Sequence, residues 1–104
     1  MTKGSYAKVR RHGPLVAVAD DIWQVEGTIT PGMGMTITRN MTVLREGQSL
    51  TIVNSVRLDD ATEQELLKLG TVKHVVKLGH YHGQDDPYYV GRFSAQLWAQ
   101  PGAQ

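Results

Sequence analysis

The chain has 104 residues, of which 40% are hydrophobic and 20% are charged, and its formal net charge is +1. This length suits one small domain with a single hydrophobic core. The small net charge gives no field that would draw the protein to nucleic acid or to an anionic membrane. The sequence has no cysteine, which excludes disulfides and thiolate metal sites.

The N-terminal segment is polar and basic, with Lys8, Arg10 and Arg11, and it lacks the apolar run of a signal peptide. No other stretch approaches the length of a membrane-spanning helix. We therefore expect a cytoplasmic protein with no nucleic-acid or membrane partner. A few charges at a chain end usually form a solvated tail, so residues 1–13 are predicted to be a flexible basic arm. Residues 14–104 are predicted to form a single domain.

The first part of this domain is predicted to consist of β-strands. Apolar and β-branched residues over 15–26 predict two short strands with a turn at Asp20 and Asp21, because Asp side chains bond nearby backbone. Residues 27–35 contain three glycines and a proline and are predicted to be a loop. The spacing of these glycines matches neither the Walker pattern nor the dinucleotide fingerprint.

A β-hairpin is predicted next. Residues 36–44 and 49–54 are rich in β-branched side chains, and the four residues between them include Gly47. A short glycine-containing turn between two such segments is typical of a hairpin.

The clearest helix signal covers residues 61–69. Asp60 is predicted to be its N-cap, with Glu63 three residues later as in a capping box, and Gly70 is predicted to be a left-handed C-cap. The helix lies between a strand over 49–56 and a strand over 72–78. A strand–helix–strand unit of this kind makes its two strands parallel, with a right-handed crossover.

The segment that follows the second of these strands carries the candidate site. His80 and His82 lie beyond its carboxyl end, where ligands bind in open α/β sheets. In an extended segment residues i and i+2 point to the same side, so the two imidazoles are expected to converge. With Asp85, or with Asp86 as a further carboxylate, they would form a site for a borderline cation such as zinc. The alternative is that both histidines are ordinary loop residues that bond backbone carbonyls.

The last elements are short. Asp86 and Pro87 predict the start of a helix that runs to Phe93, with Asp86 as N-cap and proline in the first helical position. A final strand is predicted over residues 95–99.

These motifs together resemble the metallo-β-lactamase fold family over about Val16 to Pro101. The similarity lies in His-x-His after a strand–helix–strand unit, in Asn-Ser-Val-Arg-Leu at 54–58 and in Leu-Trp-Ala-Gln-Pro-Gly at 97–102. The resemblance implies an αββα sandwich that binds one or two zinc or iron ions. It also implies hydrolysis of esters, amides, thioesters or phosphoesters by a metal-bound hydroxide.

The chain departs from the family at the metal motif. The family pattern is His-x-His-x-Asp-His, and here Gln84 replaces the Asp and Asp85 replaces the last His. A complete member is about twice as long, and its second half supplies the other ligands. His12 and His74 are poorly placed to replace them. A catalytic zinc needs three protein ligands, so we expect zinc or iron at low occupancy and no efficient hydrolysis by one chain.

The expected fold is therefore α/β (α+β), half of an αββα sandwich: a mixed β-sheet with a βαβ unit and two short helices packed on one face. Such a half leaves the other sheet face, or an edge strand, without a partner. We predict a homodimer through that face or edge. The side chains predicted to lie on the exposed face are Trp23, Ile52, Val75 and Trp98.

Three functions remain open from the sequence. The first is a truncated, catalytically degenerate relative of the metallo-hydrolases that acts as a dimeric binding module with weak divalent metal binding. The second is a metal-dependent hydrolase whose active site is completed across a homodimer. The third is a structural or interaction protein without metal. The ligand, the substrate and the biological process are not encoded in any recognisable motif.

Overall fold

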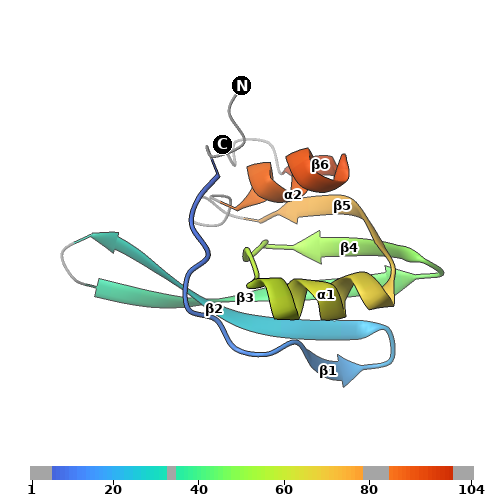
Figure 1. Cartoon of the computed structure of the whole chain (residues 1–104), viewed down its shortest axis with the longest axis horizontal. Helices are drawn as coiled ribbons and strands as arrows, with labels where there is room; N and C mark the ends of the chain where they lie inside the picture. The colour runs from blue at the N-terminus through green and yellow to red at the C-terminus, as the bar shows by residue number, and fades with distance from the viewer. Residues whose placement is uncertain (1–5, 33–34, 79–84, 100–104) are drawn as a thin grey trace.

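The computed structural model describes residues 6–32, 35–78 and 85–99. Within them the chain forms one six-stranded sheet in the order β1-β2-β3-β4-β5-β6, with two helices (Figure 1). The pairs from β1 to β4 are antiparallel, whereas β4–β5 and β5–β6 are parallel. The elements are β1 Val16–Ala19, β2 Ile22–Gly32, β3 Met35–Glu46, β4 Ser49–Val53, α1 Asp60–Leu69, β5 Thr71–Lys77, α2 Asp86–Phe93 and β6 Gln96–Ala99.

This arrangement confirms the predicted mixed sheet with a strand–helix–strand unit. The unit consists of β4, α1 and β5, and β4 ends at Val53, three residues earlier than predicted. None of the helices in the described part of the chain is long and apolar enough to cross a membrane.

The predicted turn between β1 and β2 is confirmed at Asp20 and Asp21. Asp21 has φ 60, a left-handed conformation that Asp tolerates better than most residues. The Asp21 carboxylate accepts a hydrogen bond from Arg45 Nε at 2.9 Å, and its backbone oxygen accepts one from Arg45 N. The turn is therefore fixed to the far end of β3.

The prediction of a loop over residues 27–35 is wrong. Strand β2 continues to Gly32 and β3 begins at Met35, so the two strands form one long antiparallel hairpin (Figure 1). Glycine suits Gly27 for a reason of packing, because a Cβ there would lie 2.8 Å from the side chain of Val56. The glycine content of this segment therefore predicted a loop where the chain forms a strand, in which Gly27 permits the close approach of Val56.

Gly70 ends α1, but not in the predicted left-handed conformation. Its φ of 162 is extended backbone that any residue can adopt. A side chain is excluded for a different reason, since a Cβ at Gly70 would lie 2.5 Å from the backbone oxygen of Gln48. The glycine thus lets the chain enter β5 directly beside the β3–β4 turn.

The N-cap of α1 is Asp59 and not Asp60. The Asp59 carboxylate accepts a hydrogen bond from the backbone N–H of Thr62 at 2.8 Å, which satisfies one of the free donors of the first turn. This bond lowers the pKa of Asp59 below its usual value of 3.8. The predicted capping box is absent here because the side chain of Glu63 is buried and turned toward α2.

Replacing Asp59 by alanine is therefore expected to destabilise the protein at neutral pH. A carboxylate with a lowered pKa in the folded state stabilises above its unfolded pKa, and this stabilisation is lost as pH falls through the folded value. Urea unfolding should show a clear loss for Asp59→Ala at pH 7 and a smaller loss near pH 2. Asp59→Asn keeps the acceptor and should lose less. Asp60→Ala is the matched control, and an equal loss for it would contradict the assignment.

Helix α2 starts at Asp86, with Asp85 in the N-cap position, one residue earlier than predicted. Pro87 occupies the first turn, as predicted, and the helix ends at Phe93. Asp85 makes no side-chain capping bond to the helix, because its carboxylate binds other partners. The predicted final strand is confirmed as β6.

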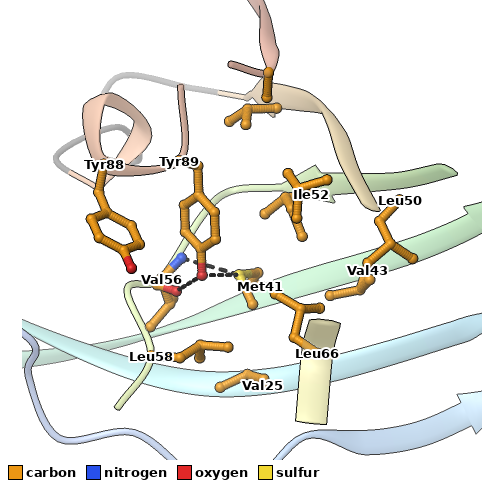
Figure 2. Packing of buried hydrophobic residues seen from close by; sticks show 13 residues of the cluster. Val25, Met41, Val43, Leu50, Ile52, Val56, Leu58, Leu66, Tyr88 and Tyr89 are labelled. Carbon is orange, nitrogen blue, oxygen red and sulfur yellow. Dashed lines mark hydrogen bonds between the residues drawn. The ribbon is translucent and has the colours of Figure 1, made fainter. Parts of the chain in front are cut away.

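The core lies between the sheet and the two helices (Figure 2). Ile52 and Val75, predicted to be exposed, are fully buried there. Trp23 is half-buried against the core, with the Arg45 guanidinium 4.8 Å from its ring, and Trp98 is exposed. The buried hydrophobic residues are Val25, Met41, Val43, Leu50, Ile52, Val56, Leu58, Leu66, Val72, Val75, Tyr88, Tyr89 and Ala95.

The described part of the N-terminal arm contacts the domain. Arg57 Nη1 donates to the backbone oxygen of Ala7 at 2.8 Å, and the hydroxyl of Thr28 donates to the backbone oxygen of Arg11 at 2.9 Å. The ring of His12 accepts from the backbone N–H of Asp59 at 2.9 Å. The flexibility of this arm in solution stays a prediction.

Candidate functional site

The predicted ligands fall into two groups. His80 and His82 lie outside the described residues. Asp85 and Asp86 are described, and both are buried at the start of α2.

Asn54 fixes the direction in which the chain leaves β5. It has φ 57, a left-handed conformation in which Asn is enriched. Its backbone N–H donates to the oxygen of Val76 at 2.9 Å, and its side-chain oxygen accepts from the N–H of Leu78 at 3.0 Å. These bonds extend the parallel β4–β5 ladder by one step and position the residue two before His80.

Asp85 forms a buried ion pair with Arg39. Arg39 Nη2 lies 2.7 Å from Asp85 Oδ2, and both side chains are 2% exposed. The same oxygen accepts the backbone N–H of Arg57 at 2.9 Å. The other oxygen, Oδ1, is buried and has no hydrogen-bond partner among the described residues, and the same holds for Nε and Nη1 of Arg39. One carboxylate oxygen of Asp85 is thus committed to the fold and the other is not.

Asp86 is held by the loop that follows β4. Its Oδ1 accepts the hydroxyl of Ser55 at 2.5 Å, and Ser55 is fully buried. Burial raises the pKa of Asp86 above 3.8, although the hydrogen bond from Ser55 and the charge of Lys77 oppose this shift. The side chain therefore joins the start of α2 to the 54–58 loop.

A third polar cluster joins the two helices. The hydroxyl of Tyr88 in α2 donates to the buried carboxylate of Glu63 in α1, and Arg92 lies 3.4 Å from the other oxygen of Glu63. Burial raises the pKa of Tyr88, and the neighbouring Glu63 raises it further. The guanidinium of Arg57 lies 4.2 Å from the centre of the Tyr88 ring. This cluster sets the position of α2 against α1.

The described residues do not by themselves form a metal site. No group of three His, Asp or Glu side chains in 6–32, 35–78 and 85–99 could hold a metal ion. Asp85 is paired with Arg39, and a bound cation would compete with that guanidinium for the carboxylate. Only Asp85 Oδ1 remains as an unpartnered acceptor among the buried side chains described. The described residues alone therefore support no metal-dependent step.

The order of the strands and the position of both helices define the class of the domain, which has the metallo-β-lactamase fold. Neither a protein-family model nor a curated protein matches the sequence. Solved structures with this fold match at probability 1.00, with 12–17% identity in those compared. At this identity the likeness establishes the fold alone.

Three of these structures illustrate the match. An NDM/FIM-1-like metallo-β-lactamase from Erythrobacter litoralis in its mono-zinc form has a TM-score of 0.62 and 16% identity, covering 84% of this chain and 43% of its own. FIM-1 from Pseudomonas aeruginosa, also in a mono-zinc form, has a TM-score of 0.62 and 13% identity, and the match covers 88% of this chain and 44% of FIM-1. DIM-1 exposed to ceftazidime has a TM-score of 0.65 and 14% identity, and the match covers 93% of this chain and 46% of DIM-1. The chain spans less than half the length of these proteins, which agrees with the resemblance to an N-terminal half.

The sequence did not indicate three residues that shape this region. Arg39 lies in a strand of alternating character, where a charged residue is usually assigned to the solvent face, yet it is buried. Ser55 and Asn54 belong to the Asn-Ser-Val-Arg-Leu motif, which indicates a family resemblance but assigns no role to either residue. The motif was the available signal, because its polar residues hold the start of α2 and the end of β5.

Proposed function

We propose that this chain is a catalytically degenerate half domain of the metallo-β-lactamase fold that acts as a dimeric binding module. In this proposal His80 and His82 give it weak affinity for a divalent cation such as zinc or iron. The observation that carries the proposal is the use of the acidic residues at the start of α2. Asp85 neutralises Arg39 and Asp86 bonds Ser55, so both serve the fold.

This use of the carboxylates argues against an efficient hydrolase. A catalytic zinc lowers the pKa of its water to about 7 only with a defined set of ligands and an open position. Two imidazoles and the single free oxygen of Asp85 give at most an incomplete set. The fold neighbours named above in mono-zinc form are more than twice as long as the part matched here.

Metal titration of untagged protein tests the proposal. We expect about one zinc ion per chain by calorimetry, bound weakly, with binding lost in His80→Ala and His82→Ala. His74→Gln is the matched control, because His74 lies in β5 and bonds Trp98, and it should bind like the wild type.

Turnover assays separate the alternatives. Generic ester and phosphoester substrates should show no metal-dependent hydrolysis that His82→Ala abolishes. Such hydrolysis would establish the hydrolase completed across a homodimer. No heat of binding with zinc or iron(II) at millimolar concentration would instead favour a structural or interaction protein without metal.

A further inference from the structure

The described part of the N-terminal arm, residues 6–13, begins with a side chain that is fitted to α2. The ring of Tyr6 meets the ring of Tyr88 edge-on, with the ring centres 5.5 Å apart. Helix α2 carries a glycine at the point of contact, and a Cβ at Gly91 would collide with the hydroxyl of Tyr6. The glycine therefore permits the arm to lie against the helix.

The other end of the arm is held along β2. The backbone N–H of Gly13 donates to the backbone oxygen of Glu26 at 2.7 Å. The hydroxyl of Thr28 donates to the backbone oxygen of Arg11 at 2.9 Å. Between these two bonds, His12 forms an isolated antiparallel bridge to β2. The arm thus extends from α2 to the edge of β2 and passes the start of α1 on the way (Figure 1).

The side chain of His12 makes a contact that depends on its protonation. It is 3% exposed, and each ring nitrogen has a hydrogen-bond partner. Nδ1 lies 2.7 Å from the backbone oxygen of Gly13, and this nitrogen carries the hydrogen because a carbonyl only accepts. Nε2 keeps the lone pair and accepts the backbone N–H of Asp59 at 2.9 Å. These two bonds together require a neutral ring with its hydrogen on Nδ1.

Protonation of His12 would add a hydrogen to Nε2. This hydrogen would point at the backbone N–H of Asp59, so two donors would face each other and the bond would be lost. The burial of the ring also disfavours its charged form. The carboxylate of Asp59 opposes both effects, because its Oδ2 lies 3.7 Å from Nε2. The Asp59 side chain is 59% exposed, however, so water screens its attraction for the ring.

Other charged groups beside the ring act in opposite directions. Glu26 of β2 and Arg11 of the arm are both exposed, and they line a hollow of about 240 Å³ together with His12. A negative and a positive side chain have opposing effects on the charge of the ring. The pKa of Asp59 is lowered by its bond from Thr62, so Asp59 stays charged over the range of about pH 5 to 8 in which histidines titrate. The charge that changes at this contact is therefore that of His12.

We propose that His12 is a pH-sensitive latch, whose neutral ring holds the arm against the domain and whose protonated ring releases it. The two states differ in the hydrogen bond between the ring and the backbone of the residue that caps α1. The predicted flexibility of the arm then belongs to the protonated state. The inference goes beyond the proposed function, because it depends on neither a metal ion nor a dimer.

Release of the arm would change the surface beside Asp85. The backbone N–H of Arg57 donates to the carboxylate of Asp85, and the Arg57 guanidinium lies over the Tyr88 ring. The same guanidinium donates to the backbone oxygen of Ala7 in the arm at 2.8 Å. When the arm leaves, the guanidinium loses this acceptor and becomes available to an anionic group from outside. The latch therefore couples pH to the exposure of an arginine next to the start of α2.

Hydrogen exchange followed by NMR on the whole chain tests the latch. The protection factor of the Gly13 amide, in which the observed rate is corrected for its intrinsic pH dependence, reports the opening of the arm. We expect it to be at least about 10-fold lower at pH 5 than at pH 7.5, as is typical for the loss of a hydrogen bond to a buried group. The amide of Val43, in the middle of the sheet, should keep its protection. The midpoint of opening should coincide with the titration of the His12 ring, followed by its carbon-13 shift.

Variants of His12 separate its titration from its packing. His12→Gln provides an acceptor near the position of Nε2 but does not titrate, so the Gly13 amide should be protected equally at both pH values. His12→Leu keeps apolar bulk without an acceptor, so protection should be low at both pH values. His74→Gln is the matched control, because His74 lies in β5 away from the arm, and this variant should open like the wild type. Circular dichroism verifies that each variant is folded.

The outcomes that would overturn the latch are distinct. Equal protection of the Gly13 amide at pH 7.5 and pH 5 in the wild type would show that protonation does not open the arm. Higher protection at pH 5 would show that the ion pair with Asp59 outweighs the lost bond. A pH dependence that persists in His12→Gln would assign the opening to another group. If His12→Gln does not fold, disagreement between the midpoint of opening and the titration of the His12 ring would overturn the proposal, and the zinc titration would decide the metal site in every case.

Discussion

Replacing Arg39 by alanine is expected to destabilise the domain by about 3–5 kcal/mol, because it leaves the carboxylate of Asp85 buried without a counter-ion. Asp85 is 2% exposed, and Arg39 Nη2 lies 2.7 Å from it. For a domain of this size the Tm should fall by at least about 12 °C. Urea unfolding at pH 7 measures the loss of free energy, and differential scanning calorimetry measures the shift in Tm.

A double variant separates the buried charge from the lost packing. Arg39→Met with Asp85→Asn removes both charges and keeps an acceptor for the backbone N–H of Arg57. We expect it to recover most of the stability, because replacing both partners of a buried ion pair by neutral groups is often nearly neutral. A loss below about 1 kcal/mol in Arg39→Ala would contradict the assignment, since it would place Asp85 in contact with water.

The pattern of strands and helices was largely predictable because it depends on local signals. The Asp20-Asp21 turn, the β4–α1–β5 unit and the Pro87 helix start each follow from short-range chemistry. The prediction failed where a glycine serves distant packing. Position 27 lies inside a strand, and it is occupied by glycine because the side chain of Val56 fills the space that a Cβ would need. No local rule in the sequence identifies Val56 as that neighbour.

The polar contacts of the candidate site were not predictable for a related reason. Arg39 and Asp85 are 46 residues apart in the sequence, and Ser55 and Asp86 are 31 apart. Alternation in β3 places Arg39 on the same face as Met41 and Val43, but hydropathy assigns an arginine to solvent. The prediction of Asp85 as a metal ligand takes no account of Arg39, because no local pattern in the sequence indicates this guanidinium partner.

The second large effect concerns Tyr89, which lies at the centre of the core between α2 and the sheet (Figure 2). Its ring stacks on the Phe93 ring, with the ring centres 6.0 Å apart, and meets the Tyr88 ring edge-on, with the ring centres 5.4 Å apart. Its hydroxyl donates to the backbone oxygen of Val56 at 2.6 Å. Burial raises the pKa of Tyr89 well above 10, so the hydroxyl keeps the proton that it donates.

Tyr89 and Met41 together satisfy a loop residue that lies outside the sheet ladder. The backbone N–H of Val56 donates to the sulfur of Met41 at 3.2 Å, and its carbonyl accepts from Tyr89. A buried backbone group without a partner costs about 1–3 kcal/mol. These two side chains therefore allow an irregular segment between β4 and α1 in which Ser55, Val56 and Leu58 are buried.

Tyr89→Ala should lower the free energy of unfolding by about 3–5 kcal/mol, because it leaves a large cavity and an unpaired carbonyl. Tyr89→Phe removes only the hydroxyl and should cost about 1–2 kcal/mol, a difference that urea unfolding resolves. Met41→Leu is the matched variant on the N–H side of Val56 and should cost a similar amount. If Tyr89→Phe were neutral while Tyr89→Ala were not, Tyr89 would act through packing alone. The 54–58 loop, which supplies hydrogen bonds to Asp85 and Asp86, would then be held in place by other contacts.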